Sequence, residues 1–245
     1  MTTDTISSRR NAADSSLCLS AILLLAGQVL FILVTQLHAG GDANEHRSIF
    51  ATYAHSSDWK GVHAFQFLAV AITVAGLVAL CSALEARTRR PMWAARIGAV
   101  LAVVSLALYG VLQAVDGIGN KQVDHAWASA ADADRSARFA SAEAMRWLEW
   151  GMSSYHAYAL GLALVAFAVA MAAAGTDVPR TIATPTGLSG IACLAEGWVA
   201  GAQGFTSTHS ILIIASWVFS LAWMTWLLVI SRRAGHAVEA RDVRR

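Results

Sequence analysis

Six apolar segments alternate along the chain with shorter polar segments. They cover residues 16–37, 61–84, 94–115, 147–174, 186–203 and 210–230. Each approaches the roughly 20 residues that a helix needs to cross the hydrocarbon core of a bilayer. None alternates strictly between apolar and polar residues, as barrel strands do, and within lipid a helix satisfies its own backbone. The pattern predicts an all-α fold, a polytopic six-helix transmembrane bundle over residues 16–231.

Composition supports this prediction. Of the 245 residues, 56% are hydrophobic and only 14% are charged, whereas about a quarter are charged in a soluble domain. The formal net charge of +2 says almost nothing about partners. The basic residues of the tails are topology signals, so we expect the lipid bilayer as the partner and no nucleic acid.

The positions of the basic residues predict an orientation. Twelve Lys and Arg residues fall on the side of the two termini, and six fall on the other side. Positive residues gather in cytoplasmic segments, so both termini are expected in the cytoplasm, with tails at 1–15 and 232–245. We expect a multi-pass protein of the inner (plasma) membrane of a bacterium. The six outer basic residues are Arg47, Lys60, Lys121, Arg135, Arg138 and Arg146.

Two longer segments, 38–60 and 116–146, connect helices on the outer side. The first holds His38, His46 and His55 among several carboxylates. Their spacing matches no zinc signature, so we interpret this segment as a solvated loop.

The second segment begins with two glycines, Gly117 and Gly119, which predict the end of the third helix at the membrane surface. Residues 122–145 are rich in alanine and predict a helix that runs into the fourth span. Trp127 and Phe139 would let this helix lie against the outer surface as a lid.

Polar residues recur at helical spacing within the apolar segments. Glu149, Ser153 and His156 follow at steps of four and three, which places them on one helix face. Corresponding faces are predicted in the other spans: Ser105, Tyr109, Gln113 and Asp116; His63 and Gln66; Ser189, Cys193, Glu196 and Gln203; and His209, Ser216 and Ser220. Lipid offers such groups no hydrogen-bond partner, so these faces should point inward.

The ionisable residues on these faces come from five helices and lie at similar depth. They are His63, Asp116, Glu149, His156, Glu196 and His209. In the alternative arrangement, each helix buries a few polar groups in separate hydrogen bonds. Three carboxylates and three histidines are harder to satisfy separately, because every buried charge needs a partner. We therefore predict a common polar cavity in the outer half of the bilayer.

Histidine nitrogen binds iron, copper and zinc, so the first functional hypothesis is a transition metal or haem b that supports redox chemistry. The cofactor or metal ligands would be His63, His156 and His209. The catalytic carboxyls would be Glu149, Glu196 and Asp116. The substrate-binding residues would be Gln66, Tyr109, Gln113, Ser153 and Gln203. No single helix carries an HxxxH or ExxH pair.

Two alternatives stay open. One is small-molecule binding from the outer side or proton-coupled transport, with Glu196 as the coupling group. Against transport, the inner half holds few polar residues and the chain shows no internal repeat. The other is an accessory subunit that anchors a membrane partner or a second copy of the chain. Cys18, Cys81 and Cys193 are expected as free thiols because they form no CxxC motif.

Two stretches carry a resemblance to known sequences. RWLEWGMSSYHAYALGLAL and GLSGIACLAEGWVAGAQGFTSTHSILIIASWVFSLAWMTWLL, within residues 146–229, are similar to bacterial six-helix integral membrane proteins of the domain-of-unknown-function kind. The resemblance implies the six-span topology and no activity.

Overall fold

The computed structural model describes residues 3–88, 92–173 and 180–242, and the side chains of 13–88, 92–173 and 180–233. Over these residues it is all-helical, which confirms the predicted class. The α-helices are α1 (Thr3–Thr35), α2 (His46–His55), α3 (Trp59–Arg87), α4 (Trp93–Ala114), α5 (Lys121–Ala128), α6 (Asp132–Ala173), α7 (Ala183–Gln203) and α8 (Ser207–Asp242). A π-helical turn, η1 (Val115–Asn120), joins α4 to α5, and a 3₁₀ turn, η2 (Arg180–Ile182), precedes α7.

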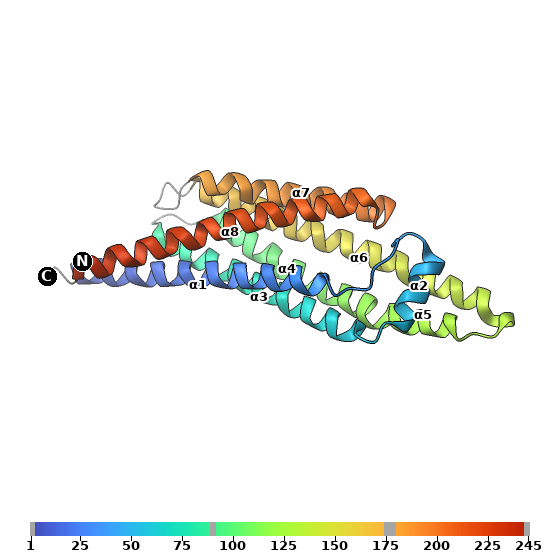
Figure 1. Ribbon diagram of the computed structural model, residues 1–245. Helices are drawn as coiled ribbons and strands as arrows, with labels where there is room; N and C mark the ends of the chain where they lie inside the picture. Colours follow the sequence, from blue (N-terminus) through green and yellow to red (C-terminus); the bar gives the residue numbers. More distant parts are fainter. Residues whose placement is uncertain (1–2, 89–91, 174–179, 243–245) are drawn as a thin grey trace.

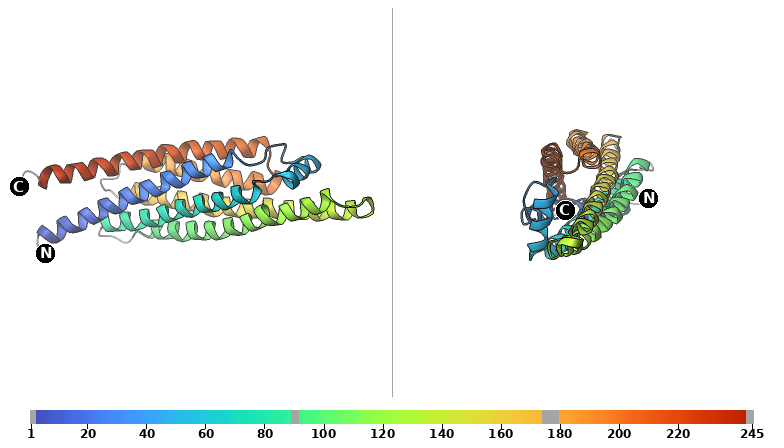
Figure 2. Two further views of the ribbon diagram at one scale, coloured as in Figure 1. Left: turned by 60° about the horizontal axis from the view of Figure 1, so that its bottom comes forward. Right: turned by 90° about the vertical axis from the view of Figure 1, so that its right-hand side faces the viewer.

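The long helices pack side by side in a closed ring. Around it, α1 contacts α3, α3 contacts α4, α4 contacts α6, α6 contacts α7, α7 contacts α8, and α8 returns to α1. Each therefore packs on the next long helix in the chain. Both termini lie at one end, the terminal end, and α2 and α5 lie at the other, the α2 end (Figures 1 and 2).

Five helical stretches in the described residues are long and apolar enough to cross a membrane. They are Ala13–Thr35, Trp59–Arg87, Trp93–Ala128, Asp132–Ala173 and Ser207–Arg233. The sixth predicted span corresponds to α7, whose four glycines and polar first turn make it less apolar. It nevertheless runs along the bundle beside α6 and α8 (Figure 1).

Glycine brings α7 unusually close to α6. A Cβ atom placed on Gly161 would lie 2.7 Å from the carbonyl oxygen of Gly190, and a Cβ on Gly190 would lie 2.7 Å from that of Gly161. Neither position has room for a side chain. Such close backbone approach is a common way to pack helices in membranes, where lipid is as apolar as the side chains.

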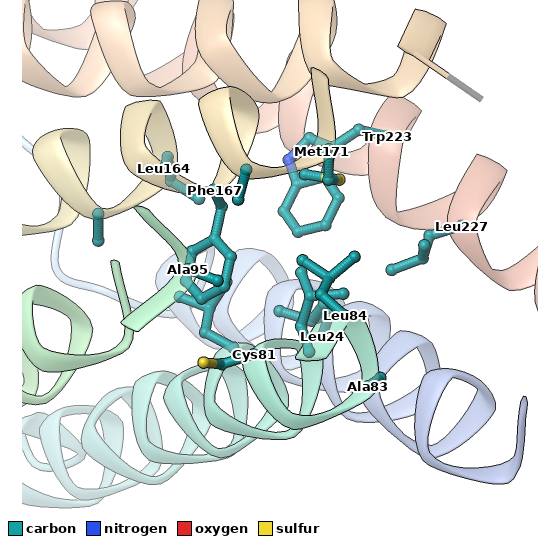
Figure 3. Packing of buried hydrophobic residues seen from close by; sticks show 14 of the residues in the cluster. Leu24, Cys81, Ala83, Leu84, Ala95, Leu164, Phe167, Met171, Trp223 and Leu227 are labelled. Carbon is teal, nitrogen blue, oxygen red and sulfur yellow. The ribbon is translucent and has the colours of Figure 1, made fainter. Parts of the chain in front are cut away.

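An apolar core fills the ring at the terminal end. Phe167 and Met171 of α6, Leu84 of α3 and Trp223 and Leu227 of α8 are fully or almost fully buried there. Figure 3 shows these side chains converging from different helices. This packing closes the inside of the bundle at that end.

The first outer segment is folded and not a solvated loop, so that interpretation was wrong. Residues His46–His55 form α2, with the Glu45 side chain accepting a hydrogen bond from the backbone N–H of Ser48 at its start. Ile49 and Phe50 on α2 are buried, as is Trp59. Sequence spacing alone missed this because the apolar face spans only about three helical turns.

The predicted end of the third helix at Gly117 and Gly119 was also wrong. The chain passes through η1 and continues as α5 to Ala128, so the glycines are accommodated within a π-helical turn. At 1.5 Å per residue, the 42 residues of α6 extend about 63 Å, roughly twice the hydrocarbon core. Part of α6 and α5 therefore project beyond the other helices at the α2 end (Figure 1).

The projecting helices pack on α2. Trp127 of α5 and Phe139 of α6 both contact the Phe50 ring, with ring centroids 6.2 Å and 5.7 Å away. The helix predicted for 122–145 is thus interrupted at 129–131, where α5 ends and α6 begins. Its action as a lid stays a prediction.

The predicted tails are helical over their described parts. Helix α1 already begins at Thr3, and α8 continues to Asp242. Residues 1–2 and 243–245 of these tails lie outside the described residues. The cytoplasmic placement of both termini remains a prediction.

Candidate metal site and cavity

A cavity of about 620 Å³ lies inside the ring of long helices. Every long helix contributes to its wall, as do the segment after α1 and helix α2. Toward the α2 end the wall is polar, with residues such as Gln66, Asp116 and Glu149. Toward the terminal end it is lined by aliphatic residues such as Leu77 and Leu164.

The predicted site residues gather around this cavity with two exceptions. The cavity is lined by Asp116, Glu149, Glu196, His156, His209, Gln66, Tyr109, Gln113 and Ser153. His63 lies behind Asp116 and not on the cavity wall. The Gln203 side chain is exposed at the end of α7, and its backbone oxygen accepts a hydrogen bond from Asn44.

Three ligand-type side chains meet at the α2 end of the cavity. His38, His63 and Asp116 each offer one ligand atom within 4.8 Å of the other two. His63 Nε2 lies 3.0 Å from Asp116 Oδ2, and the rings of His38 and His63 are 5.2 Å apart between centroids. His38 and Asp116 also line the cavity. Among the described residues, no other group of three or more His, Cys, Asp or Glu side chains lies close enough together to hold a metal ion.

Backbone carbonyls define the tautomer of both histidines. His63 Nδ1 lies 2.7 Å from the Trp59 oxygen, and His38 Nδ1 lies 3.1 Å from the Ala39 oxygen. A carbonyl only accepts, so Nδ1 carries the proton in each ring. In a neutral ring the lone pair is then on Nε2. The Nε2 lone pair of His63 faces a carboxylate oxygen at hydrogen-bond distance, an arrangement that requires a proton or a metal cation between them.

The surroundings of His38 favour its neutral form. Burial lowers the pKa of His38, and the cationic form of nearby His63 acts in the same direction, against the opposing effect of Asp116. A neutral imidazole is the form that binds a metal. His38 packs on the Trp59 ring at 4.8 Å and on the Tyr53 ring at 5.7 Å. Burial also raises the pKa of the Tyr53 hydroxyl, so this residue stays protonated.

The π-helical turn η1 positions Asp116. The indole N–H of Trp59 donates to the Asp116 backbone oxygen at 2.9 Å, which ties η1 to the start of α3. A Cβ atom on Gly117 would lie 2.7 Å from His63 Cβ. Glycine at this position thus lets η1 approach α3 closely enough for Asp116 to reach His63. Such turns are frequent at functional sites.

A buried charge network continues from Asp116. The Asn120 amide donates to Asp116 Oδ1 at 3.1 Å and to Glu149 Oε2 at 2.5 Å. Arg146 Nη1 donates to Glu149 Oε2 at 2.6 Å, and Arg146 Nη2 donates to the Ala43 oxygen at 2.8 Å. Only 1% of Arg146 is exposed. The network therefore links α6 and η1 to the segment that carries His38.

Two of the six basic residues predicted on the outer side, Arg146 and Lys121, belong to this network or lie beside it and do not simply face solvent. Arg146 pairs with Glu149, as described above. Lys121 Nζ donates to the carbonyl oxygens of Tyr53, Ala54 and Ser56 at 2.8, 2.9 and 2.6 Å. Their positive charges stabilise the interior and the end of α2, so they carry little information on orientation.

The other two predicted histidine ligands lie in separate contacts. His156 Nδ1 is 2.9 Å from Ser105 Oγ and 3.0 Å from the Ser105 oxygen, and its ring packs on Tyr109. His209 Nε2 is 3.9 Å from Glu196 Oε1. Within the described residues, His63, His156 and His209 therefore do not form one ligand group. His38 and His63 are in direct ring contact, which leaves no space for a porphyrin between them.

Sequence reasoning missed three residues of the site. The sequence predicts a solvated loop around His38 and indicates no role for Asn120. Arg146 was counted only as a surface charge, although its spacing of three from Glu149 is that of a helical ion pair. That spacing was the one available signal for the charge network.

Comparisons with protein-family models, with curated proteins and with solved structures found no match to this chain.

Proposed function

We propose that this chain is an integral membrane protein that binds a single divalent transition metal ion through His38, His63 and Asp116. The ion would lie where the metal ligands adjoin the internal cavity. Six spans, with α7 as the sixth and both termini in the cytoplasm, complete the proposal. The resemblance to six-helix bacterial membrane proteins agrees with this topology.

One observation carries the metal assignment. Both histidines donate their Nδ1 protons to backbone carbonyls, which leaves the lone pair of each neutral ring on Nε2. Each ring offers one nitrogen within 4.8 Å of the other ring and of the Asp116 carboxylate, and for His63 the nitrogen that faces Asp116 is Nε2. Metal-binding histidines commonly have this arrangement, since the second hydrogen bond orients the ring and strengthens it as a ligand. A histidine that only packs in a helix bundle needs no carboxylate and no second histidine beside it.

The ligand set also indicates the kind of ion. Two histidines with one carboxylate, leaving further coordination positions open, are typical of non-haem iron(II) sites. His38 and Asp116 reach the cavity, so a molecule held there would lie next to the open positions. Iron(II) bound in this way fits the predicted oxidoreductase class better than haem does. Glu149 would influence the ion through Asn120, which donates to both carboxylates.

The outer surface of the bundle supports the membrane assignment. Large apolar side chains of several helices point away from the ring and are mostly exposed, among them Val100, Trp198 and Val218. Extended apolar surfaces of this kind require lipid or a protein partner to cover them.

The test is the metal content of the purified protein, measured by mass spectrometry after growth in metal-supplemented medium. We expect about one iron or other transition-metal ion per chain. Removing a residue that only hydrogen-bonds to a metal ligand already lowers metal affinity by roughly 10–100-fold. Removing a ligand itself, in His38→Ala or His63→Ala, should therefore lower metal affinity by at least that much. His55→Ala is the matched control, because His55 lies exposed on α2.

His156→Ala distinguishes this site from the ligand set predicted from sequence. We expect its metal content to equal that of the unchanged protein, because His156 bonds to Ser105 and lies outside the triad. Well-folded protein without bound metal, or metal lost on His156→Ala but kept on His63→Ala, would contradict the proposal.

A further inference from the structure

We propose that the cavity binds a single-chain amphiphile, with a neutral or amine head group near Glu196 and His209 and an apolar chain that runs toward the terminal end. This extends the proposed function, since the ligand would lie beside the metal triad. Binding of the amphiphile would depend on the shape, polarity and charge of the cavity and not on the metal.

The cavity is elongated along the bundle. On α8 its wall runs from His209 to Met224, and on α6 it runs from Glu149 to Leu164. Fifteen residues at 1.5 Å each correspond to about 22 Å. Half of the hydrocarbon core measures about 15 Å, so the cavity has the reach of a lipid chain. Its volume of about 620 Å³ lies in the usual range for small-molecule sites.

Polarity changes along this length. The part toward the terminal end is lined mainly by apolar side chains, namely Val70, Val74, Leu77, Leu160, Leu164 and Met224. The hydroxyls of Thr73 and Ser220 also line it, and both are hydrogen-bonded within the protein. The part toward the α2 end carries the three carboxyls and the amides of Gln66 and Gln113, whereas Gln28 lies farther along α1, beside Gly27, which packs on Thr73. A ligand that satisfies both parts has one polar end and one long apolar end. A uniformly polar solute would leave the aliphatic wall in contact with a polar group, which is unfavourable.

Unpaired polar groups face the space where the head group would lie. Glu196 makes no hydrogen bond within the described residues, and His209 Nε2 lies 3.9 Å from its Oε1. His209 is 6% exposed, and its Nε2 has no hydrogen-bond partner. Gln113 Oε1, also on the wall, is likewise unpaired. Buried polar groups normally have partners, so a ligand that donates hydrogen bonds would satisfy them.

Charge excludes an acidic head group. No Lys or Arg is among the described residues that line the cavity, whereas three carboxyls line it. The nearby cation Arg146 is already paired with Glu149. Phosphate and carboxylate ligands are usually held by Arg or Lys, and a like charge at this site would repel them. The head group is therefore an amine or a hydroxyl.

The experiment compares three probes with the same twelve-carbon chain: dodecylamine, dodecan-1-ol and dodecanoate. Binding of each radiolabelled probe is measured on the protein in lipid nanodiscs, with empty nanodiscs subtracted. We expect saturable binding of the amine, the alcohol or both, and dodecanoate affinity lower by about tenfold or more. The proposal would be overturned if dodecanoate bound as tightly as the tighter of the other two probes, or if no probe bound saturably.

Two variants test where the two ends of the probe lie. Val74→Trp fills the aliphatic part and should abolish saturable binding, whereas Val78→Trp should leave it unchanged. These positions are on the same helix, but Val74 is 3% exposed and lines the cavity, and Val78 is 41% exposed on the outside. Glu196→Gln should weaken amine binding by about tenfold or more and change alcohol binding less. Unchanged affinities for all probes in both cavity variants would refute this placement.

Chelator-treated protein and the His63→Ala variant separate the two proposals. Probe binding that persists in a protein shown to bind no metal would leave the amphiphile site standing and remove the metal site. Metal-loaded protein without probe binding would leave the metal site standing and remove the amphiphile site.

Discussion

The two ends of the bundle are built by different interactions. At the terminal end, Phe167, Leu84 and Trp223 pack with other apolar side chains inside the ring. At the α2 end the buried groups include Arg146, Glu149 and His63, held by hydrogen bonds and ion pairs. One end is a packed core and the other a polar site.

This difference has a thermodynamic consequence. In lipid, moving an apolar side chain from the bundle to the bilayer changes its surroundings little, so packing depends on close contact and not on escape from water. A buried charge without its partner, in contrast, is expensive in either position. We therefore expect substitutions at the α2 end to be more costly than comparable losses at the terminal end, and to be the ones that disturb the site.

The largest expected effect is that of Arg146→Ala. It leaves Glu149 buried without its cation, which typically costs about 3–5 kcal/mol of folding free energy. It also removes the bond to the Ala43 oxygen that holds the segment after His38. The measurement is the denaturation midpoint in detergent together with metal content. We expect both to fall.

Two further variants sharpen this prediction. Arg138→Ala removes an exposed arginine of the same helix and should change neither quantity. Replacing both Arg146 and Glu149 by Met removes the unpaired charge and should recover most of the stability. If Arg146→Ala proves as harmless as Arg138→Ala, the α2 end does not depend on its charge network.

A smaller effect is expected for Phe167→Ala at the terminal end. Phe→Ala costs about 3–5 kcal/mol in water-soluble cores, and the part that comes from transfer out of water is reduced in lipid. The denaturation midpoint should therefore fall less than in Arg146→Ala, while metal content and probe affinity stay unchanged. Phe67→Ala, at an outward-facing and 39% exposed position, serves as the control. A loss of metal in Phe167→Ala would show that the two ends are not independent.

The smallest effect on the whole protein is expected for Lys121→Met. Lys121 donates to three carbonyl oxygens at the end of α2, where a helix leaves such groups unpaired. Hydrogen bonds from a charged donor contribute about 1.5–3 kcal/mol, and here this stabilises α2 locally. Hydrogen exchange of α2 amides should become faster, with no change in α3 or α8. Lys60→Met, at an exposed position, should leave α2 exchange unaltered.

Several features of this protein were determined by the sequence alone. Long apolar segments can only be satisfied as helices in lipid, so the all-helical class followed directly. Five of the six predicted segments lie in helices that are long and apolar enough to cross a membrane. Helical spacing then identified which polar residues share a face, such as Glu149, Ser153 and His156. Because lipid offers those faces no partners, they turn inward, and the structure places all three on one cavity.

The tertiary structure alone decided which of these groups touch. His38 pairs with His63 and Asp116 only because α2 folds over the bundle and η1 replaces the expected break at Gly117. Gln203 shares a sequence period with Glu196 but lies at the exposed end of α7. Spacing gives the direction of a side chain around its own helix. It does not give the height and distance of the neighbouring helix, which depend on close contacts between residues far apart in the chain.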